Sequence, residues 1–339
     1  MTFLRNFLVA SMVLGFFAQA ALADESVYKG KQVVIVVSAD AGTSYDLYPR
    51  TAARHLSKHI PGNPRIVVKN MPGASGMVAA NWLYNIAKKD GLTMGAIHRT
   101  LPLTQALGVK QARFDPVKFN WIGTPVQETA SCFVRSDSKY KTAEDLVNAK
   151  EPVKMAATQP RSDIFIVPLM LNNVMGANMK VTSGYRGIMA TALAVDKGEV
   201  DGICGWGYAS LRALKKDWFE KKAIRILVQV GREKHPGLKD VPLASDLAKG
   251  DKKAILEVYN KQLSVGRPWT MPPDVPAERV ETMRQAFAKV MKDPAFLKDA
   301  AKVRIQINPL HGKELQTLVA QMVDIPAANK PVLKKTFNY

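Results

Sequence analysis

Three strand–loop–helix units in series occupy the first third of the chain and constrain its fold more than any other feature. The first unit runs from a continuous β-branched segment, 33–37, through a loop of small polar residues into a helical pattern that ends near Leu56. The next two units place strands at 65–69 and 92–97. Strands that alternate with helices predict a parallel sheet covered by helices, with the carboxyl ends of the strands along one edge.

The loops after these strands combine small polar residues with the start of a helix. Such a loop brings several unpaired backbone N–H groups to one point, which suits an anion. The residues placed to contact a ligand are Ser38, Thr43 and Asp46 after the first strand, Gly73, Ala74 and Ser75 after the second, and His98, Arg99 and Thr100 after the third. An ordinary strand-to-helix turn is the alternative for each loop taken alone, and only the convergence of several loops favours binding.

A second set of strands and helices follows, with strands at 153–157, 200–204 and 224–230. The first of these leads into a polar loop and then a helix N-terminus, as in the first block. A guanidinium beside a helix N-terminus would hold a carboxylate through charge-assisted hydrogen bonds. The residues placed to do so are Thr158, Gln159, Arg161, Ser162 and Asp163.

These patterns predict an α/β fold with two lobes, because the 339-residue chain is longer than one hydrophobic core usually serves. We assign 24–125 together with 263–339 to lobe 1, and 126–262 to lobe 2. A cleft between the lobes, lined by the loops that follow the strands, is where we expect a small ligand to bind.

The first 23 residues have the features of a cleavable secretory signal peptide. One basic residue, Arg5, precedes an apolar run at 7–17, and Ala21-Leu22-Ala23 forms a small-residue cleavage site. The run is too short to span a bilayer comfortably, although an uncleaved N-terminal anchor is the alternative. We therefore expect cleavage after Ala23 and a mature protein outside the cytoplasmic membrane.

The chain is strongly basic, with a formal net charge of +19. Its Lys and Arg residues are spread along the whole length and form no basic block with interleaved aromatic residues. This distribution indicates a solvated basic surface rather than a nucleic-acid partner. Such a surface would raise the local concentration of acidic solutes.

The sequence offers no recognisable catalytic or metal-binding motif. It contains no G-x-S-x-G, H-E-x-x-H or C-x-x-C pattern. His55 and His59 stand four residues apart, but no third ligand lies nearby, so a solvated helix face is favoured over a metal site. We predict no catalytic residue, no metal and no enzyme activity.

The two cysteines, Cys132 and Cys204, each lie in an apolar, strand-like context. In an oxidising compartment they could be bridged, but two buried free thiols fit the sequence equally well. The sequence leaves this open.

The segment 41–84 resembles the periplasmic substrate-binding receptors of tripartite tricarboxylate transporters, also called the Bug family. Those receptors carry a glycine-rich loop ending in Asp, then an Asn-x-Pro-Gly-Ala-Gly-Gly turn and an Asp-Gly-x-Thr strand. The corresponding motifs here are Gly42 to Asp46, Asn70 to Gly76 and Asp90 to Thr93, and later Tyr185-Arg186-Gly187, Gly198 to Asp201 and Asp240-Val241-Pro242. They keep the family's order from about Lys31 to the C-terminal helices, so the resemblance covers nearly the whole chain after the leader.

The resemblance implies a class II periplasmic binding-protein fold, with a mixed sheet and flanking helices in each lobe. It implies a periplasmic receptor, a monomer without cofactor, that captures a small carboxylate-bearing solute and delivers it to the permease subunits of a tripartite transporter. It also adds Tyr45 to the ligand contacts and makes Tyr185 and Trp206 walls of the second lobe. Two departures affect the pocket: Thr43-Ser44-Tyr45 replaces a shorter spacer, and 158–163 replaces a Gly-Ser-rich stretch.

Two other functions are compatible with the same residues. A secreted enzyme acting on an acidic substrate could use His98 as its base, and a ligand sensor could present its closed form to a signalling protein. The sequence does not distinguish a dicarboxylate, an aromatic acid or an amino acid as the ligand, and it does not identify the permease.

Overall fold

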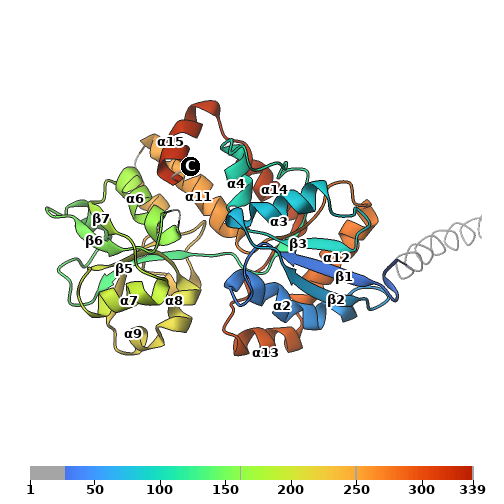
Figure 1. The fold of residues 1–339 in the computed structure, drawn as a ribbon. Helices are drawn as coiled ribbons and strands as arrows, with labels where there is room; N and C mark the ends of the chain where they lie inside the picture. The colour runs from blue at the N-terminus through green and yellow to red at the C-terminus, as the bar shows by residue number, and fades with distance from the viewer. Residues whose placement is uncertain (1–26, 161, 249, 338–339) are drawn as a thin grey trace, which may run out of the picture. The chain divides into compact units, whose positions relative to one another are not determined.

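The computed structural model describes residues 27–160, 162–248 and 250–337, and its chain falls into two compact units, each built on one mixed sheet (Figure 1). Unit 1 comprises the described residues up to 101 together with 111–125 and 267–317. Unit 2 comprises 102–110, 126–266 and the described residues from 318 onward. The predicted α/β fold with two lobes is confirmed.

The sheet of unit 1 has six strands in the order β11-β4-β10-β3-β1-β2. The three N-terminal strands run parallel, and the later ones join in antiparallel pairs. The strands are β1 (Gln32–Val37), β2 (Arg65–Asn70), β3 (Thr93–Ala96), β4 (Asn120–Thr124), β10 (Trp269–Met271) and β11 (Leu310–His311). In register, Val37 of β1 lies beside Asn70 and Ala96, so the three parallel strands end at the same level.

Helices cover both faces of this sheet. On one face, the core joins alternate residues of β1 to the apolar sides of α2 (Ser44–Leu56), α12 (Ala277–Val290) and α13 (Pro294–Lys302). On the other face, α3 (Met77–Asn85) packs closely on β3, because a Cβ on Gly95 would lie 2.4 Å from a methyl carbon of Leu83. The short 3-10 turns η1 (Ser57–His59) and η2 (Ala74–Gly76) complete the unit.

Unit 2 repeats the arrangement with a five-stranded sheet in the order β7-β6-β8-β5-β9. Its strands are β5 (Ala130–Arg135), β6 (Val153–Ala156), β7 (Met179–Thr182), β8 (Gly202–Gly207) and β9 (Ile224–Val230). Its helices are α5 (Ala143–Val147), α6 (Asp163–Met175), α7 (Ile188–Asp196), α8 (Tyr208–Leu214), α9 (Lys216–Glu220), α10 (Ala244–Leu247), α11 (Lys253–Val265) and α15 (Lys330–Phe337), with 3-10 turns η3 (Pro236–Leu238), η4 (Gly250–Lys252) and η5 (Ala327–Asn329).

Two segments that we had assigned to lobe 1 pack with unit 2. They are 102–110, which contains most of α4 (Leu101–Ala106), and the C-terminal segment that begins inside α14 (Gly312–Val323) and includes α15. The physical reason is their apolar side chains, because Leu103, Leu333 and Phe337 are buried in the same core cluster as the strands of unit 2. The chain does change units at 125/126 and at 266/267, close to the proposed boundaries, so the correction concerns only these two segments.

A disulfide joins Cys132 of β5 to Cys204 of β8. The two residues are direct partners in the antiparallel register, and both side chains are fully buried. The question that the sequence left open is therefore answered in favour of a bridge.

Candidate functional site

The carboxyl ends of β1, β2 and β3 bring three loops of unit 1 together. The backbone N–H of Ser38 donates to Ala96 O at 3.0 Å, and the N–H of Met71 donates to Val37 O at 2.8 Å. The loop after β1, the turn before α3 and the start of the segment after β3 are thereby joined at one edge of the sheet. The structure thus gathers the unit 1 residues of the predicted site.

Two buried polar atoms at this edge have no hydrogen-bond partner among the described residues. They are Oγ of Ser38, whose side chain is 2 % exposed, and Nε2 of His98. Gly76 lies beside both, since a Cβ built on it would be 3.1 Å from Ser38 Oγ and 3.3 Å from His98 Cγ. A buried polar atom without a partner is costly, so this pair indicates a place where a ligand or water completes the bonding.

The turn before α3 has a backbone conformation that is rare for its residues. Gly73, Ala74, Ser75 and Gly76 all have positive φ, at 127°, 46°, 54° and 90°. Non-glycine residues in the left-handed region are uncommon, and such strain is concentrated at functional sites. Successive backbone N–H groups in a turn of this kind form a concave arrangement that binds anions, and here the turn leads directly into the nine-residue helix α3.

His98 is held neutral by its surroundings. Burial lowers its pKa, and the positive charges of Arg267 and Arg99 lower it further, to about 4. Its ring stacks on Tyr45, with centroids 4.1 Å apart, and the Arg267 guanidinium lies 4.3 Å from the Tyr45 centroid. The Tyr45 hydroxyl accepts from the backbone N–H of Arg99 at 3.3 Å, which ties the two loops together. Arg99 is buried, and Thr100 is half-buried where the chain turns toward α4.

Asp46 holds the first loop in place. Its carboxylate is 1 % exposed and accepts from the N–H of Gly42 at 2.9 Å, from Arg50 Nε and Nη2 at 2.9 and 2.6 Å, and from Asn70 Nδ2 at 2.9 Å. Burial alone would raise the pKa of Asp46, but these bonds outweigh it and lower the pKa to about 2. Both oxygens are occupied, so the structure gives Asp46 a positioning role. The Thr43 hydroxyl also makes a hydrogen bond within this loop, donating to Asp40 O at 2.8 Å.

In unit 2, the loop after β6 also begins at the carboxyl end of a strand and leads into the N-terminus of a helix, α6. The N–H of Gly184, after β7, donates to Thr158 O at 2.7 Å, and the Ser162 hydroxyl donates to Gln159 O at 2.8 Å. Ser162 is the N-cap residue of α6, and Asp163 in the first turn accepts from the Tyr259 hydroxyl at 2.8 Å. Arg161 lies outside the described residues, as does the proposed signal peptide.

The two aromatic residues expected in the second lobe are placed differently from each other. Tyr185 is half-buried, and burial together with Glu199 raises the pKa of its hydroxyl. Trp206 is 3 % exposed, and its ring packs in the core of unit 2 with Phe133 and Trp218, both with centroids 6.3 Å away. The indole of Trp206 is therefore a core group here rather than an open wall.

The sequence reasoning missed Gly76 and Arg267. Gly76 closes the Pro-Gly turn and was visible as the last small residue before a helix. Arg267 follows α11, far along the chain from Tyr45, and no local signal links them.

Among the described residues, no group of three His, Cys, Asp or Glu side chains could hold a metal ion. His55 Nε2 instead lies 3.0 Å from a carboxylate oxygen of Asp299, and His59 Nε2 lies 3.0 Å from one of Asp293. No helix in the described part of the chain has the length and apolar character needed to cross a bilayer.

Comparisons with known proteins agree with this architecture. The family model described as "Tripartite tricarboxylate transporter family receptor" matches residues 49–336. A UPF0065 protein of Bordetella bronchiseptica is 22% identical over 295 residues, which cover 86% of this chain and 82% of that protein.

Solved structures show the same fold at low sequence identity. A TctC solute-binding protein from Polaromonas, solved without ligand, is 17% identical with a TM-score of 0.72 and covers 91% of this chain and 99% of its own. An R. palustris protein solved with adipate is 18% identical with a TM-score of 0.61 and covers 91% and 97%. Since the family model spans most of the chain, the protein belongs to the family of tripartite tricarboxylate transporter receptors, which are periplasmic solute-binding proteins.

Proposed function

We propose that this protein is a periplasmic receptor that captures a small carboxylate-bearing solute and delivers it to the membrane permease of a tripartite tricarboxylate-type transporter. One observation carries the ligand class: Ser38 Oγ and His98 Nε2 are buried without partners beside the left-handed turn at 73–76. A carboxylate offers acceptors for the serine hydroxyl, for an imidazole N–H and for the backbone N–H groups of the turn.

The electrostatics of this edge support an anion as ligand. Arg99 and Arg267 both lie close enough to His98 to lower its pKa. His98 therefore stays neutral near pH 7 and acts as a hydrogen-bonding group, while the arginines supply positive potential. Charge-assisted hydrogen bonds of this kind contribute about 1.5–3 kcal/mol each.

We also propose that Thr158, Ser162 and Tyr185 of unit 2 contact a ligand, because the loop after β6 leads into the N-terminus of α6. The adipate found with the R. palustris neighbour is compatible with this ligand class.

The test is a thermal-shift screen of mono- and dicarboxylates, aromatic acids and amino acids, followed by calorimetry on the best ligand. Ser38→Ala should weaken binding about 10- to 100-fold, because one charge-assisted hydrogen bond is lost. Ser245→Ala in α10 is the matched control and should bind as the wild type does. Unchanged affinity in Ser38→Ala would contradict the proposed carboxylate site.

The same ligand also tests the rival enzyme function. A histidine with a pKa of about 4 is a weak general base near pH 7, which disfavours His98 as the base of a secreted enzyme. The bound acid should accordingly be recovered unchanged after prolonged incubation. Turnover that disappears in His98→Ala while binding persists would favour the enzyme.

A further inference from the structure

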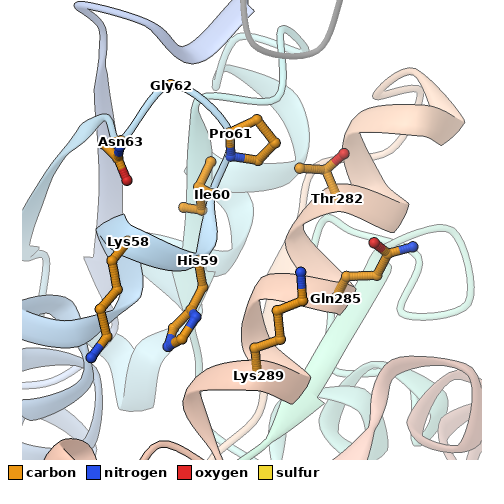
Figure 2. A pocket seen from close by; sticks show the side chains of 9 residues that line it. All are labelled: Lys58, His59, Ile60, Pro61, Gly62, Asn63, Thr282, Gln285 and Lys289. Atoms are coloured by element: carbon orange, nitrogen blue, oxygen red, sulfur yellow. The ribbon is translucent and has the colours of Figure 1, made fainter. Parts of the chain in front are cut away.

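A cavity of about 360 Å³ lies in unit 1, away from the residues discussed so far. Figure 2 shows it between the segment that follows α2 and one face of helix α12. Its volume is in the range of pockets that hold small organic ligands. The lining residues are Lys58, His59, Ile60, Pro61, Gly62, Asn63, Thr282, Gln285 and Lys289.

This cavity lies at the opposite end of the strands from the site formed by Ser38, His98 and the turn at 73–76, which we call the Ser38 site. The segment 58–63 immediately precedes β2, which begins at Arg65, so the cavity lies at the amino end of that strand. Ser38 and the turn at 73–76 follow the carboxyl ends of the parallel strands β1 and β2. The two places are therefore separated by the length of a strand, and a ligand at one does not touch the other.

The charge of the cavity favours an anion. Lys58 and Lys289 line it, and none of the described lining residues is acidic. Lys58 is paired with Asp293 at 2.5 Å, so the net positive charge comes from Lys289. Within the described part of the chain, Lys289 forms no ion pair, and Figure 2 shows its ammonium group directed into the gap between α12 and the 58–63 segment. Asn63 and Gln285 add amide groups that donate hydrogen bonds.

The basic residues on the other side of the gap are fixed in position. Asp293 accepts from Lys58 Nζ at 2.5 Å and contacts His59 Nε2 at 3.0 Å, while its second oxygen accepts from the N–H of Ala295 at 2.9 Å. Lys58 in particular lowers the pKa of Asp293 well below its usual value, so the carboxylate stays ionised. These contacts tie the 58–63 segment to the N-cap residue of α13 and so fix one wall of the cavity.

We propose that this cavity is a second binding site, which takes a small organic anion with two or more carboxylate or phosphate groups. One group of the ligand would contact Lys289 and Gln285 on α12, and another would contact Asn63 on the facing segment. Ile60 and Pro61 would pack against the carbon skeleton between them. Because the lysines are open to solvent, binding at this site should weaken as salt rises.

The experiment follows the backbone amide resonances of Gly62 and Asn63 by NMR while citrate or inorganic pyrophosphate is added at constant ionic strength. Saturable shifts with either probe support the proposal, and the probe that saturates at the lower concentration identifies the preferred group. No shift, or the same shift with sodium chloride, would overturn it.

Variants in α12 and just after its C-terminus separate a specific site from general attraction to a basic protein. Lys289→Gln should weaken the apparent affinity about fivefold, and Gln285→Glu, which places an acid in the wall, should abolish saturation. Lys292→Gln removes an equal charge from an exposed position outside the cavity and should behave as the wild type does. Equal weakening by Lys289→Gln and Lys292→Gln would overturn the proposal. Ser38→Ala should leave these shifts unchanged, so failure here is distinct from failure of the receptor function.

Discussion

At the scale of single residues, the Ser38 site depends on Gly76, because a side chain at that position would crowd Ser38 and His98. Gly76 has φ of 90°, and a Cβ added there would lie only 3.1 Å from Ser38 Oγ and 3.3 Å from His98 Cγ. Ser38 and His98 were visible as polar residues after strands. The space between them was not, because it depends on the left-handed turn that brings Gly76 against them.

Gly76→Ala should therefore reduce ligand binding more than it reduces stability. The added methyl group would meet Ser38 Oγ at 3.1 Å and occupy the space proposed for the carboxylate. We expect at least about a tenfold loss of affinity by calorimetry, together with about 1 kcal/mol of destabilisation from the positive φ. Gly42→Ala, also at positive φ but with open space around its Cβ, is the matched control for strain. Equal affinities for the two variants would contradict the proposed position of the ligand.

The sequence indicates Asp46 as a residue of the site, but it does not reveal the hydrogen-bond partners of its carboxylate. The lowered pKa of Asp46 means that its ionised form stabilises the fold, by about 2 kcal/mol for a shift from 3.8 to about 2. That contribution is complete above about pH 5 and is lost as the pH falls from about 4 toward 2.

We expect Asp46→Asn to be less stable than the wild type in urea at pH 7 and to approach it as the pH is lowered toward 2. Asp137→Asn, which removes an exposed carboxylate paired with Arg135, is the control and should change little. A stability difference for Asp46→Asn that does not depend on pH would show that its ion pairs are not the cause.

At the scale of elements, local periodicity predicted the strands well. Segments expected at 33–37 and 65–69 are observed as Gln32–Val37 and Arg65–Asn70, because β-branched runs favour the extended strand both in the centre of a sheet, as in β1, and at its edge, as in β2. Local patterns did not predict which elements far apart in the sequence pack together. His55, expected on a solvated face, contacts Asp299 within α13, and His59 contacts Asp293, the N-cap residue of that helix. Nothing in the spacing of the two histidines indicates that helix.

The disulfide between β5 and β8 should be a principal stabiliser of unit 2. It joins residues separated by 72 positions, and closing a loop of that length in the unfolded chain corresponds to about 4 kcal/mol in the chain-entropy account. Replacing both Cys132 and Cys204 by alanine should lower the thermal midpoint of the oxidised protein. The variant should also lose the sensitivity to dithiothreitol that the wild type is expected to show. A midpoint unaffected by reductant in the wild type would contradict this assignment.

At the scale of the whole molecule, the sequence predicted the family, the α/β class and the order of the motifs. It misplaced two segments, 102–110 and the C-terminal helices, between the units. An amphipathic helix reveals that it has an apolar face, but that pattern alone does not say which of two similar cores the face will join. Adjacency in sequence favoured the wrong core for α4, and Leu103 lies in the other one.

The net charge of +19 should accelerate the capture of an acidic solute. In stopped-flow measurements the association rate constant should fall as sodium chloride is raised from about 10 to about 150 mM, where the Debye length shortens to about 8 Å. The dissociation rate constant should change much less. Salt effects of equal size on both constants would point to ion binding at the site rather than to long-range attraction.

The route of the described chain through the fold has a consequence for dissecting the protein. The backbone passes from one unit to the other five times, at 101, 110, 125, 266 and 317. A fragment spanning 126–266 would therefore lack the side chains of Leu103, Leu333 and Phe337 that fill its core. Neither unit corresponds to one continuous segment of the chain. Truncated genes should therefore yield insoluble protein, and a functional protein will require both units on one polypeptide.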